Sequence, residues 1–169
     1  IRFAFDLDNN LYISDYFAQN IRIIEQNGII NNFAGNSEIG YSGDGGSSGN
    51  AEVNYPIGLS IDSYYNVYIA DSKNNAIRKC VNKYIEQPTI EEESNQERYV
   101  YTVSGNGYPG FYGNNVDATV AKLYYPFGLF LDSSNNIYIA DSLNSCIRKI
   151  DYESNEIQTI AEIGRAHVW

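Results

Sequence analysis

The chain contains very little histidine, cysteine or tryptophan and no methionine: its 169 residues include one His, two Cys and one Trp. The one imidazole, His167, leaves no basis for a Ser-His-Asp or Cys-His arrangement or for a zinc site with several histidine ligands. Cys80 and Cys146 fit neither a disulfide framework nor a metal-ligand spacing. We therefore expect both cysteines to be small buried side chains.

Positive charge is also scarce, since 11 Lys and Arg residues face 21 Asp and Glu residues and give a formal net charge of −10. Non-specific binding to nucleic acid or to an anionic membrane depends on a basic face, which this balance disfavours. No apolar run is long enough to span a bilayer, so we expect no membrane segment in this chain.

What the sequence does contain is a repeat. Its central copy contains the segments 55–59, 68–72 and 77–79, and a diverged copy with Asp6, 12–15 and 21–22 lies 56 residues before it. Periods of this length are typical of propellers and solenoids. Three segments of the central copy return 70 residues later: 55–59 as 125–129, 68–72 as 138–142, and 77–79 as 147–149.

Each copy is patterned as four short strands separated by turns, which is the composition of one propeller blade. The predicted fold is all-β: a β-propeller of four-stranded antiparallel blades, with about three blades forming an incomplete ring. We assign 1–161 to the propeller, with blades at 1–35, 56–105 and 126–161, and regard 162–169 as a non-native tail. The expected strands are 3–5, 11–14, 20–24 and 29–34, then 57–61, 67–70, 76–81 and 99–104, and finally 127–131, 137–140, 146–150 and 157–161.

The blade motifs resemble the NHL repeat, a β-propeller family. The resemblance depends on Pro56-x-Gly58 and Pro126-x-Gly128, on 66–71 and its copies, on 74–79, and on two Gly-rich connectors of equal length between the blades. It implies a ring of about six blades, so we expect this chain to be a fragment with further blades in the same polypeptide. In the first turn of each blade, the position that is usually Gly in this family is occupied by Asn9, Tyr65 and Asn135 here. A positive φ at Tyr65 would be costly.

An Asp and an Arg recur seven residues apart in every copy, and each pair could be mistaken for a catalytic one. Because they recur, we predict a structural role, in which the Asp caps a turn and the Arg pairs with a carboxylate or carbonyl. The same role is predicted for the repeated Pro-x-Gly. These structural residues are Asp15, Arg22, Asp71, Arg78, Asp141, Arg148, Pro56, Gly58, Pro126 and Gly128.

Two local motifs suggest ligand sites but fit turns better. The segment 43–46 lacks the Lys-Ser/Thr pair and the following helix of a phosphate-binding loop. Asp6-x-Asp8-x-Asn10 alternates oxygen ligands like a calcium loop, but the Gly and the distal Glu of an EF-hand are missing. We therefore predict no catalytic residue, no cofactor and no metal.

Function is expected in the positions that do not repeat. These are the two connectors, with Asp44 in the first, and a 14-residue insertion that carries Glu91, Glu92 and Glu93. We predict a non-catalytic scaffold that binds protein partners through loops at one end of the blades. The resemblance leaves two alternatives: a fragment of a metal-dependent enzyme, similar to peptidylamidoglycolate lyase or to lactonases, and an RNA-binding NHL domain.

Overall fold

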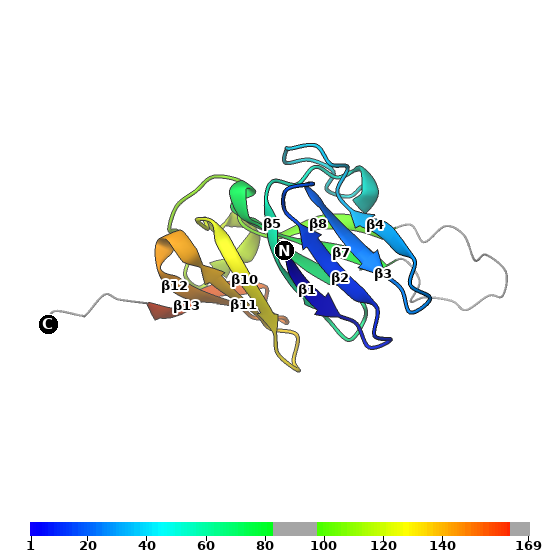
Figure 1. Cartoon of the computed structure of the whole chain (residues 1–169). Coiled ribbons are helices and arrows are strands. Elements are labelled where there is room, and N and C mark those ends of the chain that lie inside the picture. The colour runs from blue at the N-terminus through cyan, green and yellow to red at the C-terminus, as the bar shows by residue number, and fades with distance from the viewer. Residues whose placement is uncertain (83–97, 163–169) are drawn as a thin grey trace, which may run out of the picture.

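The computed structural model of the chain describes residues 1–82 and 98–162. No α-helix occurs among them, and no helix there is long and apolar enough to cross a membrane. The strands form three antiparallel sheets, numbered here as blades in chain order (Figure 1). Blade 1 contains β1 (Arg2–Phe5), β2 (Leu11–Asp15), β3 (Asn20–Ile24) and β4 (Ile30–Ala34).

The other two blades repeat this up-and-down order of strands. Blade 2 contains β5 (Pro56–Ile61), β6 (Val67–Asp71), β7 (Ala76–Asn82) and β8 (Arg98–Ser104). Blade 3 contains β10 (Pro126–Leu131), β11 (Ile137–Asp141), β12 (Cys146–Ile150) and β13 (Glu156–Glu162), with the short β9 (Val116–Asp117) added at its outer edge.

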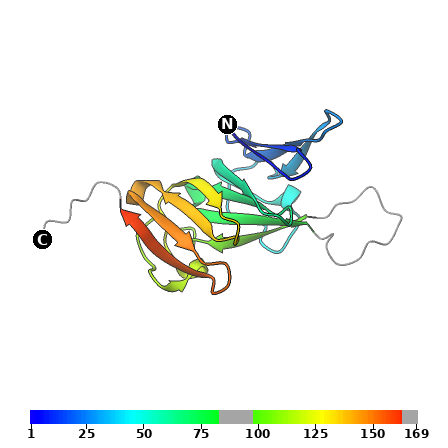
Figure 2. The same cartoon turned by 90° about the horizontal axis from the view of Figure 1, so that it is seen from below.

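The sheets stand side by side, with blade 2 between the other two (Figure 2). The first strand of blade 2, β5, contacts the first strands of both neighbours, β1 and β10. The inner strands therefore lie together and the outer strands diverge, which is the arrangement of a propeller. The all-β, blade-based prediction is confirmed, and each expected strand differs from the observed one by at most one residue at either end.

The hydrophobic core lies between the blades. Side chains alternate along each strand, so both faces of blade 2 are apolar and each contacts a neighbouring blade. On β6, Val67 and Ile69 point toward blade 1, whereas Tyr68 and Ala70 point toward blade 3. We call the face of a blade that is directed at the preceding blade its leading face, and the opposite face its trailing face.

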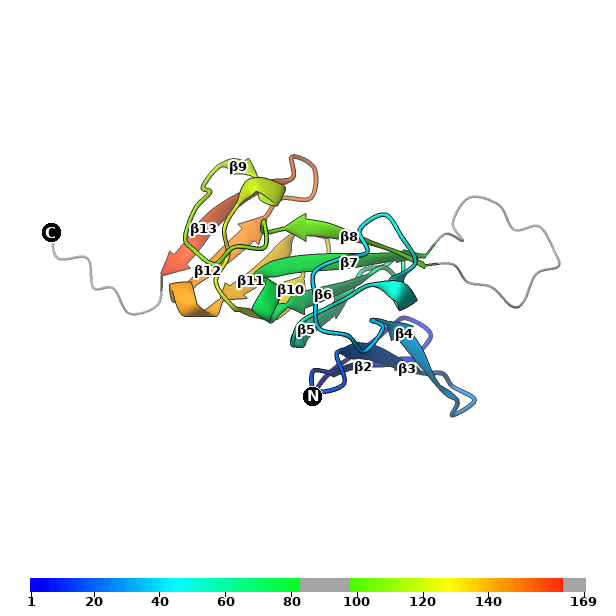
Figure 3. The ribbon, with the colours of Figure 1, turned by 90° about the horizontal axis from the view of Figure 1, so that it is seen from above.

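The connectors cover the outer edges of the blades that follow them and add hydrogen bonds to those edges. In the first connector, Gly45 N donates to Val100 O on β8 at 2.8 Å, and Val100 N donates to Gly46 O at 3.1 Å. The second connector forms β9, which pairs with β13 as a fifth strand (Figure 3). An unpaired outer strand would present open hydrogen-bonding groups, and the connectors satisfy part of that edge.

The turn between the first two strands has the same left-handed residue in every blade. Tyr65 has φ 63°, and both Asn9 and Asn135 have φ 61°, so the unusual residue in blade 2 does not change the turn. The Asp62 carboxylate holds this turn, since its Oδ1 accepts from Tyr64 N and Asn66 N, each at 2.9 Å. Cys80 and Cys146 are free and buried, as predicted.

We predict that Gly58→Ala destabilises the chain far more than the matched Gly128→Ala. A Cβ at Gly58 would lie 2.6 Å from Phe127 O and 3.2 Å from Leu129 N, both backbone atoms of the adjacent β10. At Gly128 it would meet only Ala140 Cβ, at an ordinary 3.5 Å. Urea unfolding should show a loss of about 1–3 kcal/mol for Gly58→Ala and less than about 0.5 kcal/mol for Gly128→Ala. Equal losses would contradict the close approach of β5 and β10.

Candidate functional site

Arg78 lies at the centre of a buried ionic cluster in blade 2. Its side chain is 1% exposed, and its Nη1 lies 3.4 Å from Asp71 Oδ2. Its Nη2 lies 2.7 Å from Asp44 Oδ1 and donates to Ser42 O at 3.0 Å. The guanidinium also stacks 5.2 Å from the ring centroid of Tyr41. Arg78 thus ties the first connector to the sheet of the following blade.

Asp71 completes this cluster from the end of β6. Its carboxylate accepts from Asn54 N at 2.7 Å and from Asn74 Nδ2 at 2.8 Å, besides facing Arg78. Burial is the main cause that raises the pKa of Asp71, to about 6, against the lowering effect of these donors. Because its oxygens are engaged by the protein itself, this group is a tether between chain segments.

Blade 3 forms the same pair with one change. Arg148 Nη1 lies 3.6 Å from Asp141 Oδ2, both side chains are fully buried, and Nη2 donates to Gly113 O. The position of Asp44 is Asn114 here, whose Oδ1 accepts from Thr159 N at 2.7 Å. In blade 2 the equivalent backbone contact runs from Thr102 N to Asp44 Oδ2 at 3.1 Å. The exchange therefore keeps the link to the outer strand and removes the second carboxylate.

Blade 1 departs from the predicted pattern, because Asp15 and Arg22 form no ion pair in the described part of the chain. Asp15 Oδ1 accepts from Ala18 N at 3.2 Å, and Arg22 is half-buried with its Nε unpaired. In blades 2 and 3 the Arg is enclosed by the connector that precedes the blade, and no connector precedes blade 1 within this sequence. In blades 2 and 3 the pair is thus part of a contact that also includes the connector.

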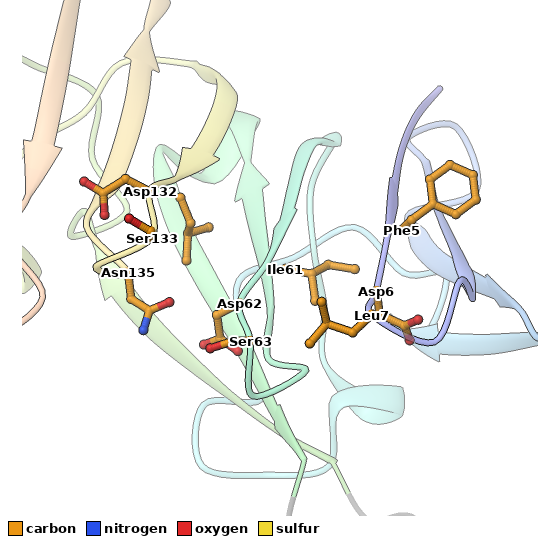
Figure 4. A pocket seen from close by; sticks show the side chains of 10 residues that line it. Phe5, Asp6, Leu7, Ile61, Asp62, Ser63, Asp132, Ser133 and Asn135 are labelled. Carbon is orange, nitrogen blue, oxygen red and sulfur yellow. The ribbon is translucent and has the colours of Figure 1, made fainter.

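The turns at one end of the axis bring three repeated carboxylates around a hollow of about 240 Å³, lined by Asp6, Asp62 and Asp132 (Figure 4). Each carboxylate is used within its own turn. Asp132, for example, accepts from Ser134 N at 2.9 Å, from Asn136 N at 3.0 Å and from Tyr138 OH at 3.1 Å. The turn prediction for 6–10 is confirmed. No group of three or more His, Cys, Asp or Glu among the described residues could hold a metal ion.

The opposite end of the inner strands carries a pocket of about 350 Å³ walled by aromatic rings. The Tyr16 and Tyr55 rings lie 4.8 Å apart, between centroids, and the Arg2 guanidinium lies 5.2 Å from the Phe127 centroid. Lys73 Nζ is 4.3 Å from the Tyr55 centroid. We name this pocket the aromatic cup, lined by Ile1, Arg2, Tyr16, Tyr55, Ile57, Tyr125 and Phe127.

Two equivalent tyrosines of the cup are held in an unusual backbone conformation. Tyr55 has φ 59° and Tyr125 has φ 53°, each directly before a proline. A side chain of the preceding blade fixes each one: Gln19 Oε1 accepts from Tyr55 N at 2.7 Å, and Asn75 Oδ1 accepts from Tyr125 N at 3.0 Å. Left-handed backbone is costly for bulky residues and concentrates at functional sites.

Sequence reasoning did not identify the cup, although the repeated Tyr-Pro step was visible. Arg2 stands where blades 2 and 3 have Gly58 and Gly128, so an axis position without a side chain elsewhere carries a long cation here. That substitution was the available signal. What the sequence could not show is that Arg2 would reach Phe127, two blades away.

The residues expected to contact a partner are only partly described. Asp44 is half-exposed, but both of its oxygens are in internal contacts with Arg78 and Thr102. Glu91, Glu92 and Glu93 lie outside the described residues. The segment 43–46 is a tight turn, as predicted, closed by Gly46 N donating to Gly43 O at 2.9 Å.

Comparison with known proteins shows a propeller-like fold and leaves the family open, because no protein family model matches the chain. SUPPRESSOR OF QUENCHING 1, chloroplastic, from Arabidopsis thaliana is 30% identical over 111 residues, which are 64% of this chain and 9% of that protein. The chain therefore spans less than a tenth of the length of this curated relative.

Three solved structures illustrate the likeness. A structural genomics protein of unknown function from Bacteroides thetaiotaomicron aligns with a TM-score of 0.68 and 22% identity, over 87% of this chain and 34% of its own. An auxiliary nutrient binding protein from Bacteroides ovatus aligns with a TM-score of 0.60 and 13% identity, over 90% of this chain and 33% of its own. A luciferin-regenerating enzyme aligns with a TM-score of 0.59 and 12% identity, over 95% of this chain and 45% of its own. At these identities the likeness shows the fold alone.

Replacing the buried Arg78 should destabilise the chain more than replacing its half-buried equivalent in blade 1, Arg22. Arg78→Met leaves the Asp71 carboxylate buried without its cation, so we expect a loss of about 3 kcal/mol or more in the free energy of unfolding. Arg22→Met removes no ion pair, and about 1 kcal/mol or less should be lost. Urea unfolding of both variants measures this. Losses of similar size would mean that the ionic cluster is not what makes Arg78 important.

The raised pKa of Asp71 should make stability depend on pH. The pKa of the Asp71 carboxyl is near 3.8 in the unfolded chain and higher in the folded chain, so the folded chain binds the proton more tightly. The stabilisation that results is complete below about pH 4 and is lost as the pH rises through about 6. The difference between the folded and unfolded pKa values corresponds to a free energy on the order of 3 kcal/mol. The free energy of unfolding of wild type minus that of Asp71→Asn should fall by this order between about pH 4 and 7. A flat difference over that range would contradict the shift.

Proposed function

We propose that the chain is part of an NHL-type β-propeller that acts as a non-catalytic interaction module and binds a segment of a protein partner in the aromatic cup. The observation that carries the proposal is the convergence of Tyr16, Tyr55, Tyr125 and Phe127 around one pocket with Arg2 at its side. Tyrosine and arginine are enriched among the residues that dominate protein interfaces.

The way the cup is built also supports recognition. Tyr55 and Tyr125 are fixed at their backbone by hydrogen bonds from a neighbouring blade, so their rings are positioned before a ligand arrives. Preorganised groups lose little conformational entropy on binding. In a partner, apolar side chains would pack on the rings, and a carboxylate would pair with Arg2.

The position of the cup agrees with the expectation that loops at one end of the blades bind partners. The cup contains the residues that start β1, β5 and β10 and the turn that follows β2, which is the end where the connectors enter the blades. None of the described lining residues is a carboxylate, imidazole or thiol. The chemistry of the lining therefore favours packing and ion pairing over acid–base catalysis.

Replacement of the two strained tyrosines by asparagine should separate binding from folding. Asparagine tolerates the left-handed conformation, so Tyr55→Asn/Tyr125→Asn should keep or slightly raise the free energy of unfolding while the rings are lost. Peptides selected from a displayed random 12-residue library on the wild-type chain should bind this variant at least about 30-fold more weakly, because a single hot-spot ring contributes roughly 2 kcal/mol.

The matched control is Tyr108→Asn, since Tyr108 is an exposed tyrosine on the second connector and lies outside the cup. Its affinity for the selected peptides should equal that of wild type. Selection of peptides that bind wild type and the cup variant equally, or failure to enrich any peptide, would contradict binding at the cup.

A further inference from the structure

A polar pocket of about 630 Å³ lies between blades 1 and 2, at the end of the blades opposite to the aromatic cup. Blade 1 supplies Asp6, Asp8 and Glu25 from the turns that follow β1 and β3, and blade 2 supplies Tyr65 and Arg98. Both walls belong to blades within this chain. Among the described lining residues, three carboxylates face a single guanidinium, so the pocket carries excess negative charge. We call it the interblade pocket.

Blade 1 lacks a lysine at a position where both other blades have one. In the register of its sheet, Ile23 is the partner of Tyr12. The same position is Lys79 in blade 2 and Lys149 in blade 3. Ile23 lies on the trailing face of blade 1 and lines the interblade pocket. The pocket is therefore found beside the one blade in which this position carries no charge.

The two lysines show which groups surround an ammonium at that position. Lys79 Nζ lies 3.9 Å from Asp62 Oδ2 and 5.0 Å from the Tyr68 ring centroid. Lys149 Nζ lies 3.9 Å from Asp151 Oδ2. The position is thus within reach of the carboxylate of the first turn, of a carboxylate two residues further along the chain, and of a tyrosine ring.

Blade 1 has all of these groups without the lysine. Asp6, Tyr12 and Glu25 are the repeat equivalents of the three contacts. The turn carboxylate is also held in the same way, since Asp6 Oδ2 accepts from Asn10 Nδ2 at 2.9 Å and from Tyr12 OH at 3.2 Å. The corresponding distances at the turn of blade 2 are 2.8 Å and 3.2 Å. Asp8 adds a third carboxylate, which neither other blade has at this position.

We propose that the interblade pocket binds the primary ammonium group of a ligand, in the place that a lysine of the chain itself occupies in blades 2 and 3. The ammonium pairs with Asp6 and Glu25 beside the Tyr12 ring, as charge-assisted hydrogen bonds and cation–π contacts require. A pocket of about 630 Å³ has room for the aliphatic chain behind the ammonium as well. The ligand is a primary alkylamine, either a lysine side chain of a partner protein or a free amine.

Arg98 limits the charge that such a ligand can carry. Its guanidinium, from the start of β8, lies 4.5 Å from the ring centroid of Phe33 in the core. The three carboxylates outnumber it by two charges, so the pocket attracts a ligand with one or two positive charges. Among the described residues, the pocket and the aromatic cup share no lining residue, so the inference stands independently of the proposed function.

An NMR titration of the 169-residue chain, followed through its backbone amides, measures this binding with two probes. Nα-acetyl-lysine methylamide represents a lysine of a partner protein, and cadaverine represents a free amine. At least one should shift the amides of Asp8, Asn10 and Glu25, with a dissociation constant in the millimolar range or below, and the tighter probe identifies the source. The lysine probe acetylated at Nε has no charge and should bind at least about 10-fold more weakly.

Replacing Ile23 tests the position directly. Ile23→Lys gives blade 1 the lysine of the other blades, so it should bind either probe at least about 10-fold more weakly, because its own ammonium then pairs with Asp6 and Glu25. The matched control Ile23→Leu keeps an apolar side chain of the same size and should bind like wild type. Glu25→Gln, at a half-buried position, provides a second variant should Ile23→Lys not fold, and it should weaken binding about 2–5-fold.

Four results would overturn the proposal. The first is a set of shifts confined to the aromatic cup, and the second is equal binding of the charged and the neutral lysine probe. The third is an unchanged affinity in a folded Ile23→Lys variant. The fourth is a response of these amides to calcium chloride but to neither amine, which would make the pocket a metal site.

Discussion

The structure depends on one constraint: a blade has two apolar faces and cannot bury either by itself. Strand alternation places Val67 and Ile69 on one side of blade 2 and Tyr68 and Ala70 on the other, and the cores form only where two blades meet. Stability in such an architecture is a sum over neighbouring interfaces. Blade 2, covered on both sides, is therefore the best-buried part of the described chain.

The polar contacts serve the same requirement. Arg78 and Arg148 each fasten the connector that precedes their blade, and the connector in turn pairs with the outer strand of that blade. Gln19 and Asn75 fasten the start of the following blade. Apolar faces thus hold neighbouring blades together, while these buried polar groups set the path of the chain from one blade to the next.

Much of the fold could be predicted from the sequence, because strands and turns depend on local sequence and the same pattern occurs in three copies. The strand limits followed from that repetition, whereas the left-handed turn at Tyr65 was not expected of a bulky residue. What could not be predicted depends on contacts distant in the chain: the short strand β9 and the internal contacts of Asp44 both depend on where the connectors lie. The convergence of Arg2 and Phe127 in the cup likewise requires the curvature of three blades.

Arg2 has a consequence for how a ligand would reach the cup. The chain carries a formal net charge of −10, yet the cup holds Arg2 at its wall and Lys73 beside Tyr55. An acidic ligand is therefore repelled by the net charge of the chain and attracted by these two cations at the cup. Since these fields decay over about 8 Å at physiological ionic strength, salt weakens the distant repulsion more than the short-range attraction at the cup. The two cations at the cup thus favour a direction of approach as well as a ligand charge.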